Sequence, residues 1–221
     1  MNYIKLEQFV SKPRLERYLH SCSNSQTRAL ELYKANLKVS QTFYPILNLM
    51  ETFLRNSINH QLSQHYSDID WILNQKNGFM NHYSLGPKFW LKSQIDKAEV
   101  KTNGKITSGK IIAEQTLGFW TSLFEPRHYK LVSGYVIHCF PNKPRHINRN
   151  VISKNLNEIR EFRNRIYHNE SICFNKKNID FTQAIHVKKL IYETLAWMDT
   201  DLINYIMQFD MVDEEIHLAL S

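Results

Sequence analysis

The chain has 221 residues, of which 43% are hydrophobic and 22% are charged, a composition that excludes an intrinsically disordered protein. Because 28 Lys and Arg face 21 Asp and Glu, the net charge is +7, which favours a polyanionic partner such as a nucleic acid without identifying one. Six glycines and six prolines are too few for the turns of an all-β fold, so we expect helices.

The cysteines and the apolar runs indicate a cytoplasmic protein without a membrane anchor. Cys22, Cys139 and Cys173 are odd in number and form no C-x-x-C motif, which favours free thiols in a reducing compartment. Charged residues interrupt the apolar residues of the first twenty positions, so no signal-peptide core is expected. No run approaches the roughly 20 apolar residues of a membrane-spanning helix.

Apolar residues spaced three and four apart predict most elements. Ser11 is expected to cap a short helix that begins at Pro13. A long helix should start near Ser25 or Thr27 and run to about residue 66, and Pro45 should kink or split it. Its apolar stripe consists of Phe43, Ile46, Leu47, Met50, Phe53, Leu54, Ile58 and Leu62.

The rest of the chain is expected to be helical as well, apart from its loops. Residues 67–88 have an irregular pattern, and residues 127–140 fit a helix or a strand. Basic residues dominate the loop near 141–150. We therefore predict one all-α domain over residues 1–221. Further helices are expected at 89–100, 111–124, 148–169 and 180–209.

Two apparent motifs are set aside. Gly104–Lys110, "GKITSGK", matches part of a phosphate-binding P-loop, but Ile111 replaces the required Ser or Thr and no buried strand precedes it. The ten histidines include no H-E-x-x-H pair, and His60 and His65 are too far apart to share a helix face. We therefore expect neither a metal site nor a cofactor.

The predicted helix at 148–169 carries the candidate site. On a helical wheel its apolar residues fall on one face, and Glu161 and Arg165 fall opposite as an i,i+4 pair. The core residues are Ile152, Leu156, Ile159, Phe162 and Ile166. A third face holds Arg160, Arg163, Asn164, Tyr167 and His168.

This third face suits chemistry on a phosphodiester. Asn164 lies four residues before His168, so its amide is expected to orient the imidazole, while Arg163 and His168 are five apart and should bracket a groove. A histidine transfers protons near neutral pH, and a guanidinium stabilises a phosphate that gains charge. RNA supplies its own nucleophile, the 2′-hydroxyl. The alternative remains open that these polar side chains only hold neighbouring helices together by hydrogen bonds.

Arg163–His168 matches the R-x-x-x-x-H motif of the HEPN superfamily, and the chain resembles its Abi-like (abortive infection) branch. Segments like "YPILNLMETFLRNSINHQL", "TLGFWTSLF" and "IREFRNRIYHNESI" occur in that branch in the same order. The resemblance implies an all-α, HEPN-like helical bundle with additional helices. It also implies a metal-independent endoribonuclease and homodimers whose two motifs share one cleft.

The resemblance also implies residue roles and products. His168 would be general acid or base, Arg163 would stabilise the scissile phosphate, and Asn164 would orient His168. The products would carry a 2′,3′-cyclic phosphate and a 5′-hydroxyl. Glu51 and Arg55 match a second polar signature of the branch, either as a structural ion pair between helices or as accessory catalytic residues.

Basic and aromatic residues around the motif are expected to bind RNA. Arg160 and Tyr167 would grip a neighbouring phosphate or base, and Lys143, Arg145 and Arg149 would guide the backbone, unless they form only a solvated loop. The expected function is a toxin of a phage-defence or toxin–antitoxin system, restrained by a separately encoded protein or RNA antitoxin. The alternatives are a non-catalytic HEPN module that binds RNA, a nucleotide or a protein, and a helical interaction protein.

Overall fold

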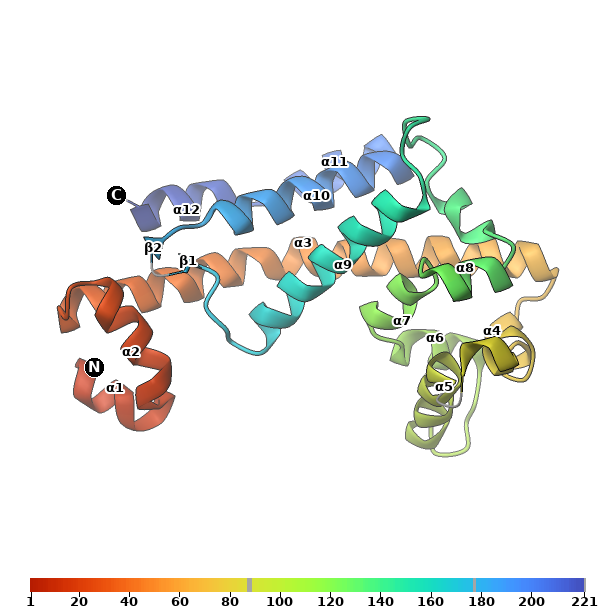
Figure 1. Ribbon diagram of the computed structural model, residues 1–221, viewed down its shortest axis with the longest axis horizontal. Helices are drawn as coiled ribbons and strands as arrows, with labels where there is room; N and C mark the ends of the chain where they lie inside the picture. The colour runs from red at the N-terminus through yellow and green to blue at the C-terminus, as the bar shows by residue number, and fades with distance from the viewer. Residues whose placement is uncertain (87–88, 177, 221) are drawn as a thin grey trace. The chain divides into compact units, whose positions relative to one another are not determined.

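The computed structural model describes residues 1–86, 89–176 and 178–220, and in this part of the chain it contains twelve α-helices and one small hairpin (Figure 1). The all-α prediction is confirmed. The chain forms two compact units. The first unit comprises Met1–Asn48, Glu161–Ile191 and the residues from Asn204 on, and the second comprises Leu49–Arg160 and Tyr192–Ile203. The single domain expected over residues 1–221 stays a prediction.

The helices of the described chain follow in order. The N-terminal half contains α1 (Tyr3–Val10), α2 (Lys12–Ser21), α3 (Gln26–Tyr66), α4 (Trp71–Asn74), α5 (Trp90–Lys101) and α6 (Ser108–Glu114). The C-terminal half contains α7 (Leu117–Ser122), α8 (Pro126–Leu131), α9 (Arg149–Tyr167), α10 (Thr182–Met198), α11 (Thr200–Met207) and α12 (Val212–Leu220). Short 3₁₀ helices lie at Phe79–Asn81, Tyr83–Leu85 and Tyr135–Cys139. Strands β1 (Phe174–Asn175) and β2 (Asn178–Ile179) pair antiparallel.

Two short helices open the first unit. Helix α1 was not predicted, and Asn2 caps it by accepting a hydrogen bond of 2.9 Å from the Lys5 N–H. Ser11 lies at the N-cap position of α2, as expected, but it has a φ of +83° and its side chain makes no capping bond. Ser11 therefore joins two helices through a left-handed backbone instead of capping the second with its hydroxyl.

Helix α3 continues unbroken through Pro45, so Pro45 does not split the helix, and the alternative, a kink at this residue, stays a prediction. A proline removes one backbone hydrogen bond and crowds the preceding turn. Burial of the apolar stripe offsets this cost, because its members before and after the proline are 0–2% exposed, with the half-buried Phe53 as the exception. The fully buried members are Phe43, Ile46, Leu47, Met50, Leu54, Ile58 and Leu62.

In the second unit, the helix expected at 111–124 is divided into α6 and α7. Gln115 ends α6 because its backbone is extended and its buried side-chain amide donates to the Ile111 carbonyl at 3.0 Å. The ambiguous segment at 127–140 forms α8 and a 3₁₀ helix. No strand is assigned to those described residues.

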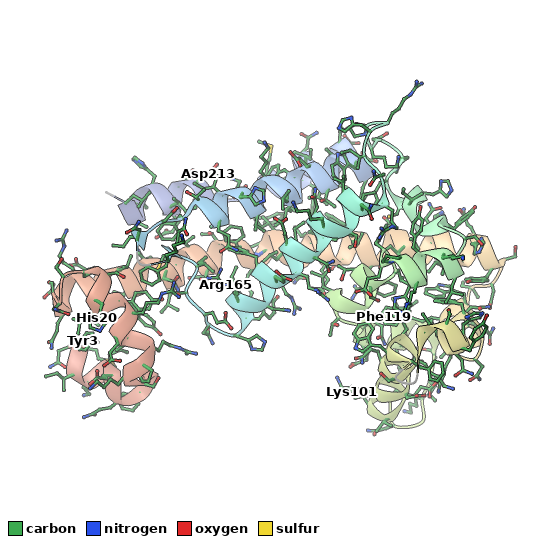
Figure 2. All side chains as sticks on the ribbon, in the orientation of Figure 1. Tyr3, His20, Lys101, Phe119, Arg165 and Asp213 are labelled. Atoms are coloured by element: carbon green, nitrogen blue, oxygen red, sulfur yellow. The ribbon has the colours of Figure 1, made fainter. Side chains whose placement is uncertain are left out.

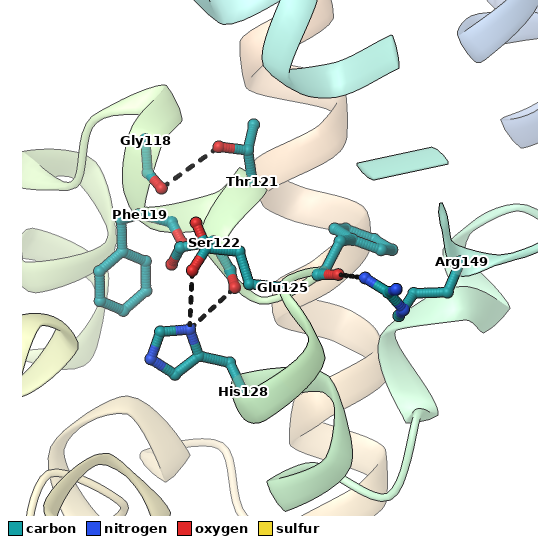
Figure 3. A network of polar contacts seen from close by, with 8 residues as sticks. Gly118, Phe119, Thr121, Ser122, Glu125, His128 and Arg149 are labelled. Atoms are coloured by element: carbon teal, nitrogen blue, oxygen red, sulfur yellow. Dashed lines mark hydrogen bonds and ion pairs between the residues drawn. The ribbon is translucent and has the colours of Figure 1, made fainter. Parts of the chain in front are cut away.

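A buried histidine links α8 to the end of α7 in the same unit (Figure 3). The His128 Nδ1 lies 2.9 Å from the Ser122 carbonyl oxygen, so this nitrogen carries the proton and donates. Burial lowers the pKa of His128, and the Ser122 carbonyl and the Glu125 carboxylate 4.0 Å away oppose this effect only in part. His128 is therefore a neutral structural donor.

The helix expected at 180–209 is divided into α10 and α11, and a short segment then leads to α12. Asp199 separates α10 from α11, and its carboxylate accepts a hydrogen bond of 2.9 Å from the Asp201 N–H. In the first unit, Lys188 of α10 forms ion pairs of 2.8 Å with Asp210 and 2.7 Å with Asp213. These pairs hold α12, which the sequence analysis did not predict.

Candidate functional site

Helix α9 presents the predicted core face. Ile152, Leu156, Ile159, Phe162 and Ile166 are all at most 2% exposed, so the predicted core face is confirmed. In the first unit, the Phe162 ring packs edge-on against Phe43 of α3 with 4.9 Å between the ring centroids. This packing fixes the rotation of the last turns of α9 and therefore the direction of the polar side chains beside it.

Arg163 is half-buried beside this core and stacks on Tyr167 one turn later. Its Cζ lies 4.0 Å from the centroid of the Tyr167 ring, a cation–π distance. The Tyr167 ring also packs against Tyr44 of α3, with 5.0 Å between centroids and an interplanar angle of 30°. Tyr167 therefore connects the guanidinium to α3 and restricts where the Arg163 side chain can point.

The end of α9 is a Schellman motif, in which a residue with left-handed backbone closes the helix. The Asn169 N–H donates to the Ile166 carbonyl at 3.0 Å, and the Glu170 N–H donates to the Arg165 carbonyl at 2.8 Å. Asn169 supplies the left-handed residue, with a φ of +53°. The helix therefore ends two residues before the predicted position 169, and His168 occupies the C-cap.

His168 has a fixed backbone and an exposed side chain. Its N–H donates to the Asn164 carbonyl at 2.9 Å. We expected the Asn164 amide to contact the imidazole, but among the described residues this backbone bond is the hydrogen bond that joins the two residues. Asn164 is also exposed, so both polar groups face solvent on the last turn. The role assigned to Asn164 as a positioning residue stays a prediction.

Arg165 organises the loop that follows His168, a role that the sequence analysis missed. Its guanidinium donates to the Ser171 carbonyl and to the Gln183 side chain of α10, and its Nε lies 3.8 Å from Glu170. The predicted pairing with Glu161 is therefore wrong. Because the loop folds back over the helix end, Arg165 finds nearer acceptors there than on its own helix.

A buried asparagine holds the far end of the same loop. Asn36 of α3 is 2% exposed, and its Oδ1 accepts a hydrogen bond of 2.8 Å from the Ile172 N–H. Sequence reasoning missed it, although Asn36 follows Leu32 and precedes Val39 on an apolar helix face. An amide at such a position signals a buried hydrogen-bonding partner.

Arg160, Glu51 and Arg55 belong to the second unit and are half-buried. Glu51 makes at least one polar or electrostatic interaction, and the role of Glu51 and Arg55, as an ion pair between helices or as accessory catalytic residues, stays a prediction. The Nε atoms of Arg55 and Arg160 are buried and have no hydrogen-bond acceptor in the described part of the chain. A buried donor without an acceptor costs free energy, and the described structure shows no group that offsets this cost at either atom.

The basic residues before α9 also belong to the second unit. Arg149, labelled in Figure 3, donates from Nη1 to the Phe124 carbonyl at 2.8 Å and lies 6.0 Å from the Tyr129 ring. These contacts give Arg149 a structural role at the end of α7. Arg145 is exposed and Lys143 is half-buried. Thus the first unit gathers Arg163, Asn164, Tyr167 and His168, whereas the other predicted RNA-binding residues lie in the second unit.

The three cysteines of the chain are free and buried, which confirms the predicted thiols of Cys22, Cys139 and Cys173. No group of three or more His, Cys, Asp or Glu side chains in the described residues is arranged to hold a metal ion. None of the described helices is both long enough and apolar enough to cross a membrane.

Comparison of the chain with protein-family models, with curated proteins and with solved structures found no match.

Proposed function

We propose that this chain is a metal-independent endoribonuclease that acts through Arg163 and His168, as its resemblance to the Abi-like HEPN branch implies. One observation carries the proposal: a guanidinium held on the Tyr167 ring precedes an exposed imidazole by five residues within the same unit. The first group suits a phosphate and the second suits proton transfer. Both occur on backbone that packing and the Schellman motif hold in position.

The reaction is a transesterification within RNA. The 2′-hydroxyl loses its proton and attacks the adjacent phosphorus, and the P–O bond to the 5′-oxygen breaks as that oxygen gains a proton. His168 transfers one of these protons, a contribution worth about 10² to 10⁴ in rate. Arg163 stabilises the extra negative charge on the phosphoryl oxygens in the transition state. The products are a 2′,3′-cyclic phosphate and a 5′-hydroxyl.

A single imidazole serves one of the two proton transfers at a time. A homodimer in which two copies of the motif face one cleft would supply a second histidine for the other transfer. In the cell, cleavage of RNA would make the chain a toxin of a phage-defence or toxin–antitoxin system, held in check by a separately encoded antitoxin.

The decisive experiment incubates the purified chain of 221 residues with defined single-stranded RNAs and identifies the new ends. We expect cleavage that persists in EDTA, with 5′-hydroxyl ends that polynucleotide kinase can label directly. His168→Ala and Arg163→Ala should each lower the rate by at least about 100-fold. His217→Ala, an exposed histidine of α12 in the same unit, is the matched control and should cleave at the wild-type rate.

The outcomes separate the candidate functions. Equal cleavage by wild type and His168→Ala, or a strict need for a metal ion, would contradict the mechanism. RNA binding without cleavage by the wild type would instead favour the non-catalytic HEPN module. His168 is exposed, so its replacement should leave the melting temperature unchanged, and a loss of activity is then chemical and not structural.

A further inference from the structure

Two concave surfaces in the first unit share Arg17 and are lined by basic side chains. One is lined by Arg14, Arg17 and Arg165 together with the loop after His168, and has a volume of about 410 Å³. The other is lined by Arg17, His20 and Lys176 and has a volume of about 640 Å³. We call them together the arginine groove, defined by Arg14, Arg17, Arg165 and Lys176. Figure 2 labels His20 on α2 and Arg165 on α9.

The arginine groove carries an excess of positive charge. Among the described residues its lining contains these four permanent cations and one carboxylate, that of Glu170, which lies 3.8 Å from the Arg165 Nε. The neighbouring carboxylate of Glu16 pairs at 3.7 Å with Lys12. Like charges held close together repel one another, and bound anions relieve this repulsion. The groove is therefore suited to a ligand with more than one negative charge.

Two of the arginines are held in place by the protein. Arg17 donates to the Ser171 Oγ at 3.1 Å and to the Lys176 carbonyl at 3.3 Å, and its Cζ lies 4.5 Å from the Phe174 ring centroid. Arg165 is fixed by its bonds to the loop and to α10. Guanidinium groups fixed in this way lose little freedom when they bind phosphate.

Arg14 differs from these two, because it is exposed and makes no hydrogen bond or ion pair with any residue that the structure describes. It lies on the first turns of α2, where it contributes charge without a structural task. Replacing Arg14 should therefore lower the positive electrostatic potential of the groove without disturbing the fold.

The groove starts beside the candidate catalytic histidine. Asn169, Glu170 and Ser171 line it and directly follow His168 in the chain. We propose that the arginine groove binds the phosphates of an RNA strand on one side of the linkage that is cleaved. The choice of RNA as the ligand rests on the proposed function. The charge, the concave shape and the exposure of Arg14 do not depend on it.

The test measures RNA binding separately from cleavage. The His168→Ala chain, which should bind without cleaving, is titrated against a fluorescein-labelled single-stranded RNA of about 12 nucleotides at several salt concentrations. Adding Arg14→Glu should raise the Kd about tenfold and reduce the slope of log Kd against log salt by about 0.7 for each phosphate that the groove no longer binds. Arg127→Glu makes the same charge change at an exposed position of α8 in the second unit and should change the Kd less than about threefold.

A second measurement separates this proposal from the nuclease assignment. In the chain with His168 intact, Arg14→Glu should slow cleavage of the RNA of about 12 nucleotides. It should not slow cleavage of a dinucleotide, which is too short to reach the groove. If no form of the chain cleaves RNA, but Arg14→Glu weakens RNA binding and Arg127→Glu does not, then the groove binds RNA and the nuclease proposal fails. Equal effects of Arg14→Glu and Arg127→Glu, or no effect of either, would overturn the groove. Arg14-dependent binding of anionic lipid vesicles without RNA binding would also overturn it.

Discussion

The guanidinium carbon of Arg163 lies 4.0 Å from the centre of the Tyr167 ring, and the same ring packs against Tyr44 of α3. The candidate phosphate-binding residue thus rests on an aromatic face, which orients the guanidinium.

This stack predicts different effects for two substitutions of Tyr167. Tyr167→Ala removes the ring and should lower RNA cleavage two- to fivefold, because an exposed cation–π contact is worth about 0.5–1 kcal/mol. Tyr167→Phe keeps the ring and should cleave at nearly the wild-type rate. Single-turnover cleavage rates measure both. An equal loss in Tyr167→Phe would mean that the hydroxyl, and not the ring face, supports Arg163.

The Schellman motif predicts which residues position 169 tolerates. Asn169→Gly should keep the stability within a few tenths of a kcal/mol, because glycine readily adopts the left-handed φ of +53°. Asn169→Val should lower the free energy of unfolding by about 1–2 kcal/mol, since a β-branched residue is strained there. Urea unfolding measures both values. A valine variant as stable as the glycine variant would show that the loop does not need this conformation.

His128 predicts a loss of stability in mild acid. Its folded-state pKa is lowered by burial below the usual value of about 6.5, so the unfolded chain binds a proton more readily. The free energy of unfolding should therefore be unaffected by His128 above about pH 6.5 and fall as the pH drops toward the folded pKa, by at most about 1.4 kcal/mol per pH unit. His128→Asn keeps an N–H donor but does not titrate. It should therefore remove the part of the pH dependence of the unfolding free energy that His128 causes. If the free energy of unfolding depended on pH identically in the wild type and in His128→Asn, this account would be contradicted.

We expect replacement of Lys188 to lower the free energy of unfolding strongly, because it breaks a buried ion pair. Burial lowers the pKa of Lys188, but the bonds and charges of Asp210 and Asp213 outweigh it, so the pKa is raised overall and stability should decline as the pH rises above about 10.5. Lys188→Ala removes the cation beside the Asp210 side chain, which is only 6% exposed, and should cost about 3–5 kcal/mol.

Lys154→Ala, at an exposed pair with Glu158, is the control for this experiment. Its cost should stay below about 1 kcal/mol, because water screens such a pair. Thermal or urea unfolding of the two variants compares them directly. Equal costs would mean that burial does not set the strength of the Lys188 pairs.

The core of α9 was predictable from the sequence, because a single strong period places its five apolar residues on one face. The bounds of α5 were also close, expected at 89–100 and found at Trp90–Lys101. Continuity through Pro45 was not predictable, because it depends on tertiary burial that outweighs a local cost. The break at Gln115 was not predictable either, because a side-chain hydrogen bond, and not a glycine or proline, ends α6.

The candidate site was predictable only in part. Spacing alone placed Arg163, Asn164, Tyr167 and His168 on one face, and the first unit does hold them together. An asparagine such as Asn169 directly after a periodic helix is a C-cap signal, and it could have predicted the end of α9. The roles of Asn36 and Arg165 depend on a loop that folds back from residues distant in the chain, so no local pattern reveals them.

The burial of all three thiols makes the chain well suited to spectroscopic work. Cys22, Cys139 and Cys173 are shielded from solvent, and burial raises the pKa of Cys173 to about 12, so the native thiols should be slow to ionise and to meet a maleimide reagent. A cysteine placed on the exposed loop beyond α9 would then be the preferred point of attachment for a dye or spin label. Motion of that loop during RNA turnover could be followed without first engineering away any natural cysteine.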